Sequence, residues 1–347
     1  MGLDPIAETL ADPRSFGFRQ FRRCADAIEH LFNVLALKAS ACWILEADIE
    51  GCFDRISHAW LLRFIPMKRH ILSQWLKAGY MEGGRSFPTK EGTPQGGIAS
   101  PVLANMTLDG LEAAIRNALP KVKGKQLKVN INRYADDFVV TAAEKNILTD
   151  YALPATEAFL AERGLNLSKI KTRIVHINEG FDFLGQTVRK FKGKLIIRPA
   201  KKSVKSLLAS IRMNLKRLQS ATTKDVIGKL NPILRGWANY HRHVVSAQTF
   251  SYIDWKLYHM LWRWARRRHQ NRSKHWIARR YWRPHLGPWR FTAAWKEKSG
   301  KQYTMGLFHL SELPIKRHLK IRSAANPYSL SWQDYFAQRL ASKPIRV

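Results

Sequence analysis

Two short apolar segments predict neighbouring strands of a buried sheet. The first covers residues 43–48 and becomes acidic at its end, before a helix whose start is marked by Ser57. The second is interrupted by the run Tyr134-Ala135-Asp136-Asp137, with residues 129–131 before it and residues 138–140 after it. This pattern predicts a β-hairpin that carries acidic residues at its tip.

Helical periodicity dominates the second half of the chain. From residue 201 to residue 219, apolar side chains recur at helical spacing and many of the other positions are basic. A second basic helix is predicted over residues 253–268, with Trp255 and Trp262 in the core. The two apolar stripes consist of Val204, Leu207, Leu208, Ile211, Leu215 and Leu218 in the first helix, and Leu257, Met260, Leu261 and Trp264 in the second.

The adjacent carboxylates Asp136 and Asp137 are the first candidates for chemistry. Two neighbouring anions on a half-buried hairpin repel each other, so a cation or a hydrogen-bond network must offset their cost. Asp48, at the end of the first predicted strand, joins them if both strands belong to one sheet. Oxygen ligands of this kind suit Mg²⁺ and phosphoryl transfer. Two simpler explanations stay open: a solvated hairpin tip, and a helix cap or surface ion pair at Asp48.

Five sequence motifs carry a family resemblance. They read SFGFR at residues 15–19, GTPQGGIASPVLAN at 92–105, KTRIVH at 171–176, FDFLG at 181–185 and LNPILRGWANYHR at 230–242. Together with the acidic run, they resemble the bacterial reverse transcriptases that group II introns encode. The last motif is similar to the start of the maturase, or X, domain, which serves as the polymerase thumb. Five motifs in the family's order are far more specific than any single one.

The resemblance implies an α+β fold in which a polymerase palm is followed by an all-helical thumb. We expect residues 1–195 to form the reverse transcriptase palm with residual fingers, residues 196–290 the thumb or maturase X domain, and residues 291–347 a basic tail. Only residues 1–14 precede the first motif, so we expect incomplete fingers. Residues 325–336 look like the stretch before an HNH nuclease in longer relatives, and we therefore expect no endonuclease activity from this polypeptide.

The resemblance also implies a catalytic centre and a primer grip. Its catalytic residues, which would also bind two Mg²⁺ ions, are Asp48, Asp136 and Asp137. The FDFLG motif corresponds to the primer grip, formed by Phe183, Leu184 and Gly185. Gly185 would let the primer backbone approach closely, although a strand glycine can also mark an ordinary bulge.

Three further residues are expected to contact the incoming nucleotide. By resemblance, Phe53 is a steric gate that favours deoxynucleotides, Gln95 lies beside the nucleotide and the templating base, and Lys171 lies near the triphosphate. Each position also has a plainer explanation. Phe53 is then a core aromatic, Gln95 belongs to a glycine-rich turn, and Lys171 is a solvated surface lysine.

The charge of the chain indicates a nucleic-acid partner independently of the motifs. The formal net charge is +33 over 347 residues, which fits a polyphosphate ligand. From residue 201 to residue 290, roughly twenty Lys and Arg residues accompany only Asp225 and Asp254. Aromatic residues alternate with arginines over residues 275–291, which suits stacking on unpaired RNA bases or packing in a small core. The candidate RNA-binding residues are Arg235, Arg242, Arg263, Arg266, Arg267, Arg268, Arg279 and Arg280.

Other protein classes find little support in the composition. The three cysteines, Cys24, Cys42 and Cys52, show neither a disulfide pattern nor zinc-ligand spacing. No signal peptide or apolar span of membrane length is visible, so we expect a cytoplasmic, nucleoid-associated protein. The sequence indicates neither the oligomeric state nor the particular intron.

Two functions of different class are compatible with these features. The first is an RNA-directed DNA polymerase that binds group II intron RNA, assists its splicing, and extends a DNA primer on an RNA template with deoxynucleoside triphosphates. The second is a non-catalytic RNA-binding maturase, or a remnant, that has lost polymerisation together with its fingers. The intact acidic triad, with Phe53 and Gln95, favours the first. A retron or defence-type reverse transcriptase would leave the motif at residues 230–242 unexplained.

Overall fold

The chain forms two compact units. The structure is a computed structural model that describes residues 2–82, 85–87, 91–93, 97–121, 126–283, 290–297 and 299–341. One unit, here called the sheet unit, comprises Met1–Phe183, Arg189–Leu195 and Leu319–Val347. The other, the helical unit, comprises Leu184–Val188 and Ile196–His318.

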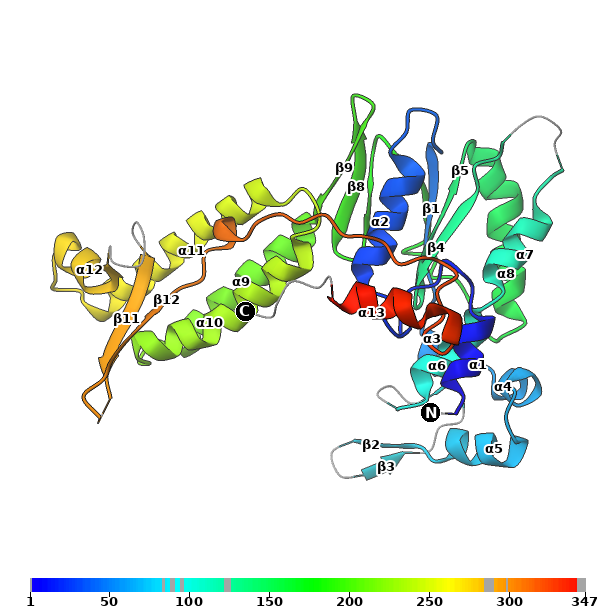
Figure 1. Cartoon of the computed structure of the whole chain (residues 1–347), viewed down its shortest axis with the longest axis horizontal. Coiled ribbons are helices and arrows are strands. Elements are labelled where there is room, and N and C mark those ends of the chain that lie inside the picture. Colours follow the sequence, from blue (N-terminus) through cyan, green and yellow to red (C-terminus); the bar gives the residue numbers. More distant parts are fainter. Residues whose placement is uncertain are drawn as a thin grey trace. The chain divides into compact units, whose positions relative to one another are not determined.

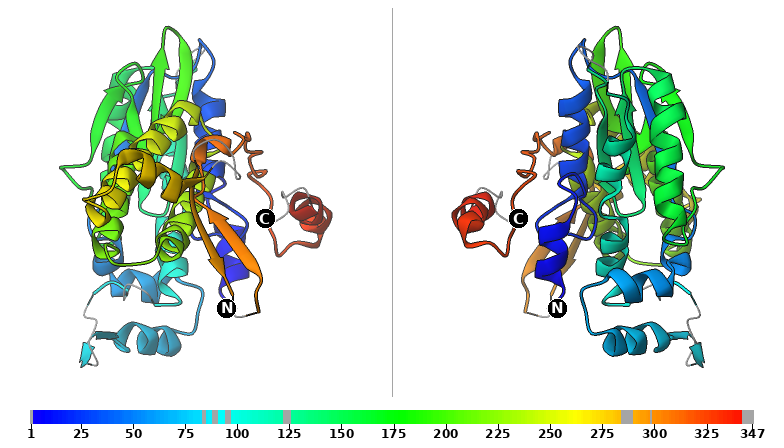
Figure 2. Two further views of the ribbon diagram at one scale, coloured as in Figure 1. Left: turned by 90° about the vertical axis from the view of Figure 1, so that its left-hand side faces the viewer. Right: turned by 90° about the vertical axis from the view of Figure 1, so that its right-hand side faces the viewer.

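A four-stranded sheet in the order β4-β5-β1-β6 forms the centre of the sheet unit. Its strands, all antiparallel to their neighbours, are β1 (Trp43–Asp48), β4 (Asn130–Tyr134), β5 (Asp137–Ala142) and β6 (Arg173–His176). The adjacent β1 residues Ile44 and Leu45 are both fully buried, so both faces of the sheet are covered. The covering helices are α2 (Cys24–Leu35) on one face, and α7 (Leu111–Ala118) and α8 (Leu153–Ala161) on the other (Figure 1, Figure 2).

Shorter elements complete the sheet unit. They are α1 (Asp4–Leu10), α3 (Cys52–Arg55), α4 (His58–Phe64), α5 (Arg69–Lys77), α6 (Ser100–Leu108), the π-helix η1 (Ile147–Ala152), and the two-stranded sheet of β2 (Tyr80–Glu82) and β3 (Arg85–Phe87). Helix α4 begins where the sequence predicts, because the Ser57 hydroxyl accepts a hydrogen bond from the backbone N–H of Trp60.

Residues 319–341 pack against the sheet unit and belong to it. This segment contains η3 (Leu330–Trp332) and α13 (Gln333–Ala341). Asp26, at the start of α2, is completely buried and needs partners. Its carboxylate accepts hydrogen bonds from the Ile321 backbone N–H at 2.6 Å and from the Arg339 guanidinium at 3.0 Å. The segment is therefore an integral part of this unit.

Four helices form most of the helical unit. They are α9 (Lys201–Arg217), α10 (Thr223–His241), α11 (Ala247–Arg268) and α12 (Lys274–Tyr281), followed by the sheet β10-β11-β12 (Trp282–Arg283, Arg290–Lys296, Gln302–Gly306) and the 3₁₀-helix η2 (Leu310–Glu312). Their apolar faces share one core. A further sheet, in the order β7-β8-β9, consists of β7 (Phe181–Phe183), β8 (Gln186–Phe191) and β9 (Lys194–Pro199), and it contributes residues to both units.

The expected α+β class, a mixed α/β part followed by a helical region, is confirmed, but the region after residue 290 differs from a separate tail. Residues 291–318 join the helical unit, because Phe291 and Leu307 are buried in its core. The placement of Trp255 in the core is wrong, since its side chain is 54% exposed. On a helix that advances about 100° per residue, Trp255 points roughly 200° away from the buried Ile253 and Leu257.

Candidate active site and nucleic-acid interface

The acidic hairpin tip lies beside the end of β1. Strands β4 and β5 pair as far as Tyr134 and Asp137, so Ala135 and Asp136 form a two-residue turn in which Ala135 has a φ of 57°. Asp137 lies directly opposite Asp48 in the antiparallel pair of β1 and β5. Directly opposite residues project to the same face of a sheet. The structure therefore brings the Asp48 and Asp137 side chains together, next to the turn that carries Asp136.

Burial and mutual repulsion raise the pKa of two of these carboxyl groups. The pKa of Asp137 is raised to about 7, first by burial and then by its hydrogen bond with Asp48 and the charge of Asp136. The pKa of Asp136 is raised as well, by burial first and also by the charge of Asp48. A cation among these groups would relieve the repulsion, so the hairpin tip favours the binding of positive charge.

One positive charge already reaches the carboxylates. Lys171 Nζ donates to Asp48 Oδ2 at 2.8 Å, although the lysine side chain is 66% exposed. The backbone supports this contact, because the Ser168 N–H donates to the Asp48 carbonyl at 2.8 Å and the Lys171 N–H donates to the Ser168 carbonyl at 3.2 Å. The hydrogen bond to Asp48 raises the pKa of Lys171. An exposed ammonium on a flexible stem can also turn away when another charged group arrives.

The three aspartates are suitable donors for a divalent metal without forming a finished ligand set. Across the ranges that the structure describes, no group of three or more His, Cys, Asp or Glu side chains is arranged to hold a metal ion. The carboxylate oxygens of the three aspartates are nevertheless suitable ligands for Mg²⁺. This ion completes its coordination with water and substrate phosphates. A bound metal would offset the cost of the charge on Asp137, whose pKa is raised by burial and by the neighbouring carboxylates.

A buried polar network supports the hairpin turn. Arg133, only 1% exposed, forms an ion pair with Asp109 and donates to Asn105 Oδ1 at 3.2 Å. Asn105 Nδ2 donates to the carbonyl oxygen of Gly17 at 2.8 Å. Gly17 lies so close to the turn that a Cβ atom there would be 2.3 Å from the backbone nitrogen of Ala135. None of these residues was predicted from the sequence. Gly17 and Asn105 could have been found by their membership of the motifs at residues 15–19 and 92–105, whereas Arg133 and Asp109 lie outside both motifs.

Phe53 lies beside the loop that leads to Gln95. Its half-buried ring packs against the core of the sheet unit and makes a T-shaped contact with the exposed Phe18, with ring centroids 6.0 Å apart. The Thr93 N–H donates to the Phe53 carbonyl. Gly92 has a φ of 74°, and a Cβ there would lie 2.3 Å from the same carbonyl oxygen, so only glycine permits this approach. Gln95 itself lies outside the described residues.

The expected primer-grip residues occupy the end of β7 and the turn that follows. Phe183 is buried and ends the strand. Leu184 and Gly185 have φ angles of 48° and 70°. Two successive residues with positive φ form a tight turn into β8, so Gly185 does not mark a bulge within a strand.

Seven of the eight expected RNA-binding arginines are exposed, and all of them lie in the helical unit. Arg235 lies in α10, and Arg263, Arg266, Arg267 and Arg268 lie in α11. Arg279 and Arg280 lie in α12. Their exposure leaves them accessible to a phosphate backbone.

Three of the expected arginines contact other elements of the helical unit. The Arg235 guanidinium lies 5.5 Å from the ring centroid of Phe308. Arg242 is half-buried and donates to the Pro314 carbonyl at 3.0 Å. Arg268 donates to the carbonyl oxygens of residues 219 and 221. These contacts help to hold the helical unit together, and RNA contacts by these three residues stay a prediction.

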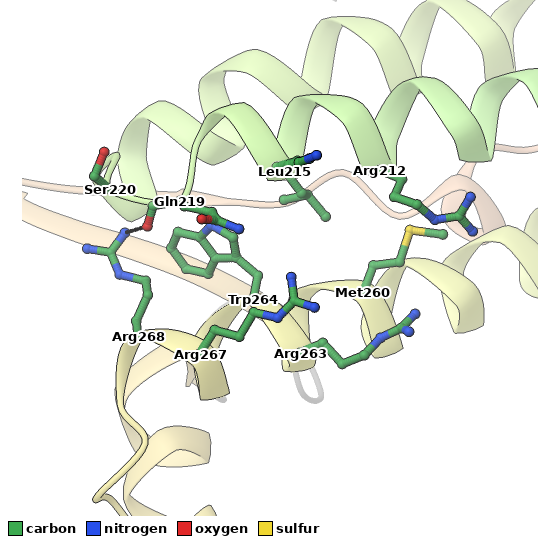
Figure 3. Close-up of a pocket in the computed structure, with 10 residues that line it drawn as sticks. Arg212, Leu215, Gln219, Ser220, Met260, Arg263, Trp264, Arg267 and Arg268 are labelled. Carbon is green, nitrogen blue, oxygen red and sulfur yellow. Dashed lines mark hydrogen bonds between the residues drawn. The ribbon is translucent and has the colours of Figure 1, made fainter.

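A basic groove lies between α9 and α11 (Figure 3). Its volume is about 600 Å³, and its apolar lining consists of Leu215, Met260 and Trp264. The cations come from both helices, and no acidic residue lines the groove in the described part of the chain: they are Arg212, Lys216, Arg263, Arg267 and Arg268. Sequence reasoning missed Arg212 and Lys216. Their spacing of four positions on the polar side of a predicted helix was the signal that could have found them.

Two known protein families match successive parts of this sequence. Residues 2–188 match the family "Reverse transcriptase (RNA-dependent DNA polymerase)", and residues 204–282 match "Group II intron, maturase-specific domain". The group II intron-encoded protein LtrA of Lactococcus lactis subsp. cremoris is 26% identical over 311 residues, which cover 71% of this chain and 51% of LtrA. Protein YkfC of Escherichia coli (strain K12) is 27% identical over 231 residues, which cover 55% of this chain and 59% of YkfC.

The matches cover about half of each curated relative and more than half of this sequence. Among solved structures, apo telomerase from Candida tropicalis aligns with a TM-score of 0.44 and 13% identity over 74% of this chain and 50% of the telomerase chain, which adds nothing to the assignment. None of the described helices is long and apolar enough to cross a membrane. Since the match at residues 2–188 covers more than half of the sequence, the chain belongs to the reverse transcriptase family and carries a group II intron maturase-specific domain after its polymerase region.

Proposed function

We propose that this protein is an RNA-directed DNA polymerase of the group II intron type that also binds its intron RNA as a splicing maturase. The observation that carries the proposal is the meeting of Asp48 and Asp137 across two paired strands, beside the Asp136 turn and with Lys171 bound to Asp48. The order of the two matched domains supports the pairing of the two activities. The substrates would be an RNA template, a DNA primer and deoxynucleoside triphosphates.

The proposed reaction is nucleotidyl transfer. The primer 3′-hydroxyl attacks the α-phosphate of a deoxynucleoside triphosphate, a phosphodiester bond forms, and pyrophosphate leaves. Reverse transcriptases use divalent metal ions, and here Asp48, Asp136 and Asp137 would hold two Mg²⁺ ions. When bound, such ions lower the pKa of the attacking hydroxyl and stabilise charge on the phosphates. Asp48 and Asp137 belong to paired strands, so the sheet fixes their separation.

Lys171 would act on the triphosphate. Its ammonium is held by Asp48, but the exposed side chain is free to turn toward a bound phosphate. In that position it would neutralise the departing pyrophosphate or donate a proton to it. The contact with Asp48 then keeps the lysine near the reacting groups between turnovers.

Phe53 would select deoxynucleotides over ribonucleotides. Its backbone is fixed by Thr93 and its ring by the core and by Phe18, so the ring has little freedom to move aside for a 2′-hydroxyl. Gln95, two residues after Thr93, would lie beside the incoming nucleotide and the templating base.

Intron RNA would bind mainly to the helical unit. The exposed arginines of α11 and α12 and the basic groove between α9 and α11 provide positive charge on that unit. Phosphates that bind there release counterions, which gives strong, salt-dependent affinity. A protein with these RNA and DNA partners would work in the cytoplasm at the nucleoid.

Extension of a DNA primer on an RNA template in the presence of Mg²⁺ tests the proposal. Wild type should extend the primer, and Asp136→Ala should abolish extension. Asp150→Ala removes an exposed carboxylate in η1 of the same unit and should extend like wild type. RNA binding should be nearly equal in all three proteins, because most of the proposed RNA-binding charge lies in the helical unit.

Two other outcomes would change the proposal. A wild-type protein that binds RNA tightly but extends no primer would support the alternative, a non-catalytic RNA-binding maturase. Loss of RNA binding in Asp136→Ala would show that the chemical and binding roles are not divided as proposed.

A further inference from the structure

The turn between β7 and β8 is held in a conformation that its first residue does not adopt freely. Leu184 has a φ of 48°, which is sterically unfavourable for a residue with a branched side chain. Two hydrogen bonds hold the turn. The Tyr240 hydroxyl, on α10, donates to the Leu184 carbonyl at 2.9 Å, and the Ala200 N–H, at the start of α9, donates to the Gly185 carbonyl at 2.9 Å. Two helices of the helical unit therefore fix the backbone of this turn.

His241, the last residue of α10, is the centre of a buried hydrogen-bond network next to the turn. Its side chain is 1% exposed. Gln186 Nε2 lies 2.8 Å from Nδ1 of the ring, and Ser203 Oγ lies 3.2 Å from Nε2. An amide nitrogen can only donate, so Nδ1 accepts and Nε2 carries the hydrogen that points at Ser203. Trp237 Nε1 donates to the same Ser203 oxygen at 3.1 Å.

The network depends on a neutral imidazole. A protonated ring would place a hydrogen on Nδ1, against the amide hydrogens of Gln186. Burial, and then the charge of His243, lowers the pKa of His241 to about 3, so the ring stays neutral near neutral pH. The His241 ring, at the end of α10, thereby joins β8 through Gln186 and α9 through Ser203.

We propose that Tyr240, His241 and Ser203 are positioning residues that set the backbone of the Leu184-Gly185 turn and, through it, the 3′ end of the primer. This inference rests on the proposed polymerase function. Tyr240 and His241 are consecutive residues at the end of α10, so a movement of that helix end is passed to the turn through both side chains. Part of the maturase-specific domain would then serve polymerisation as well as RNA binding.

The substitution Tyr240→Phe tests the inference without creating a cavity in the core. It removes one hydroxyl from a side chain that is 39% exposed, and Tyr258→Phe on α11 is a matched control with the same exposed fraction. In RNA-templated primer extension, kcat should fall roughly three- to tenfold in Tyr240→Phe, the loss expected of one hydrogen bond. The KM for the nucleotide, the melting temperature and the affinity for single-stranded RNA should stay unchanged, and Tyr258→Phe should behave like wild type.

A binding measurement separates this inference from the polymerase proposal. The fluorescence of 2-aminopurine at the 3′ end of a DNA primer, annealed to an RNA template, reports how the protein places that end without any nucleotide or chemistry. Tyr240→Phe and Ser203→Ala should each change this signal, and Ser203→Thr, which keeps the hydroxyl, should restore it. Unchanged fluorescence in folded Tyr240→Phe would overturn the inference. If wild type extends no primer, the polymerase proposal fails, and the fluorescence still decides whether these residues position the primer end.

Discussion

Asn105 Nδ2 donates a hydrogen bond to the carbonyl oxygen of Gly17 at 2.8 Å, across 88 positions of sequence. Arg133 donates to Oδ1 of the same side chain at 3.2 Å, so both ends of the amide are used and its orientation is fixed. This arrangement holds the backbone of Gly17 against the nitrogen of Ala135. The turn that carries Asp136 is therefore supported by residues that would take no part in the chemistry.

Gly17→Ala should disturb that turn. The added Cβ atom would lie 2.3 Å from the Ala135 nitrogen, and backbone cannot move aside as a flexible side chain can. We expect a destabilisation of about 1–3 kcal/mol and a large loss of primer extension. Gly228→Ala, inside α10, is the control: its Cβ would meet no atom within 4 Å, and alanine should stabilise the helix by about 0.5–1 kcal/mol. Urea unfolding and primer extension check both variants, and wild-type behaviour of Gly17→Ala would refute the close contact.

Lys171→Ala should slow primer extension with little effect on folding. The lysine side chain is 66% exposed, so loss of its ion pair with Asp48 should change the free energy of unfolding by less than about 1 kcal/mol. Lys171→Arg separates two roles, because arginine keeps the charge but does not give up its proton. Retained activity in Lys171→Arg indicates neutralisation of pyrophosphate, and lost activity indicates proton donation. The neighbouring Lys169→Ala serves as control, and full activity of Lys171→Ala would exclude both roles.

The double substitution Arg212→Ala with Lys216→Ala should weaken RNA binding through the basic groove. For every phosphate that the variant no longer binds, the slope of log affinity against log salt should fall by roughly one unit. Lys201→Ala with Lys205→Ala removes the same charge from exposed positions of the same helix outside the groove. A salt titration by fluorescence anisotropy with intron RNA compares the two proteins. Equal reductions in both would mean that overall charge, and not the groove, determines the affinity.

Stability should decline in acid partly because of His30. Burial first, and then the charges of Lys320 and Arg14, lowers the pKa of His30 to about 4. The unfolded chain binds a proton near the ordinary value of about 6.5, so it takes up more protons than the folded chain between these values. The contribution of His30 to the free energy of unfolding is therefore complete above pH 6.5 and is lost as the pH falls to about 4. Over this range, the free energy of unfolding changes by at most about 1.4 kcal/mol per pH unit because of His30.

Urea unfolding between pH 4.5 and 7.5 tests this dependence. His30→Phe should flatten the slope in part, because the lowered pKa of His241 adds a similar contribution in the other unit. His275→Gln, at an exposed position, is the control and should keep the wild-type slope. An unchanged slope in His30→Phe would show that His30 does not titrate on unfolding.

The elements that the sequence predicts well are those with a local pattern. Strand β1 ends at Asp48, and α4 begins after Ser57, because burial on a strand and capping of a helix are set by residues close to one another in the chain. The helices α9 and α11 follow from apolar spacing in the same way.

Contacts between residues that are far apart in the sequence could not be predicted from these local patterns. The placement of Gly17 under the Ala135 turn depends on Asn105 and Arg133, which come together only in the folded sheet unit. The division of residues 291–347 between two units likewise depends on which buried surfaces they meet. Periodicity shows that a face is covered but does not identify the segment that covers it.

The burial of Asp26 also has a consequence for the biogenesis of the chain. Its partners, Ile321 and Arg339, are encoded 295 and 313 positions later, after the whole helical unit. At ordinary rates of translation, a ribosome takes roughly 15–60 s to reach them. During that interval the nascent sheet unit lacks these two partners of Asp26, so this part of it is open to chaperones and proteases until residue 339 has been translated.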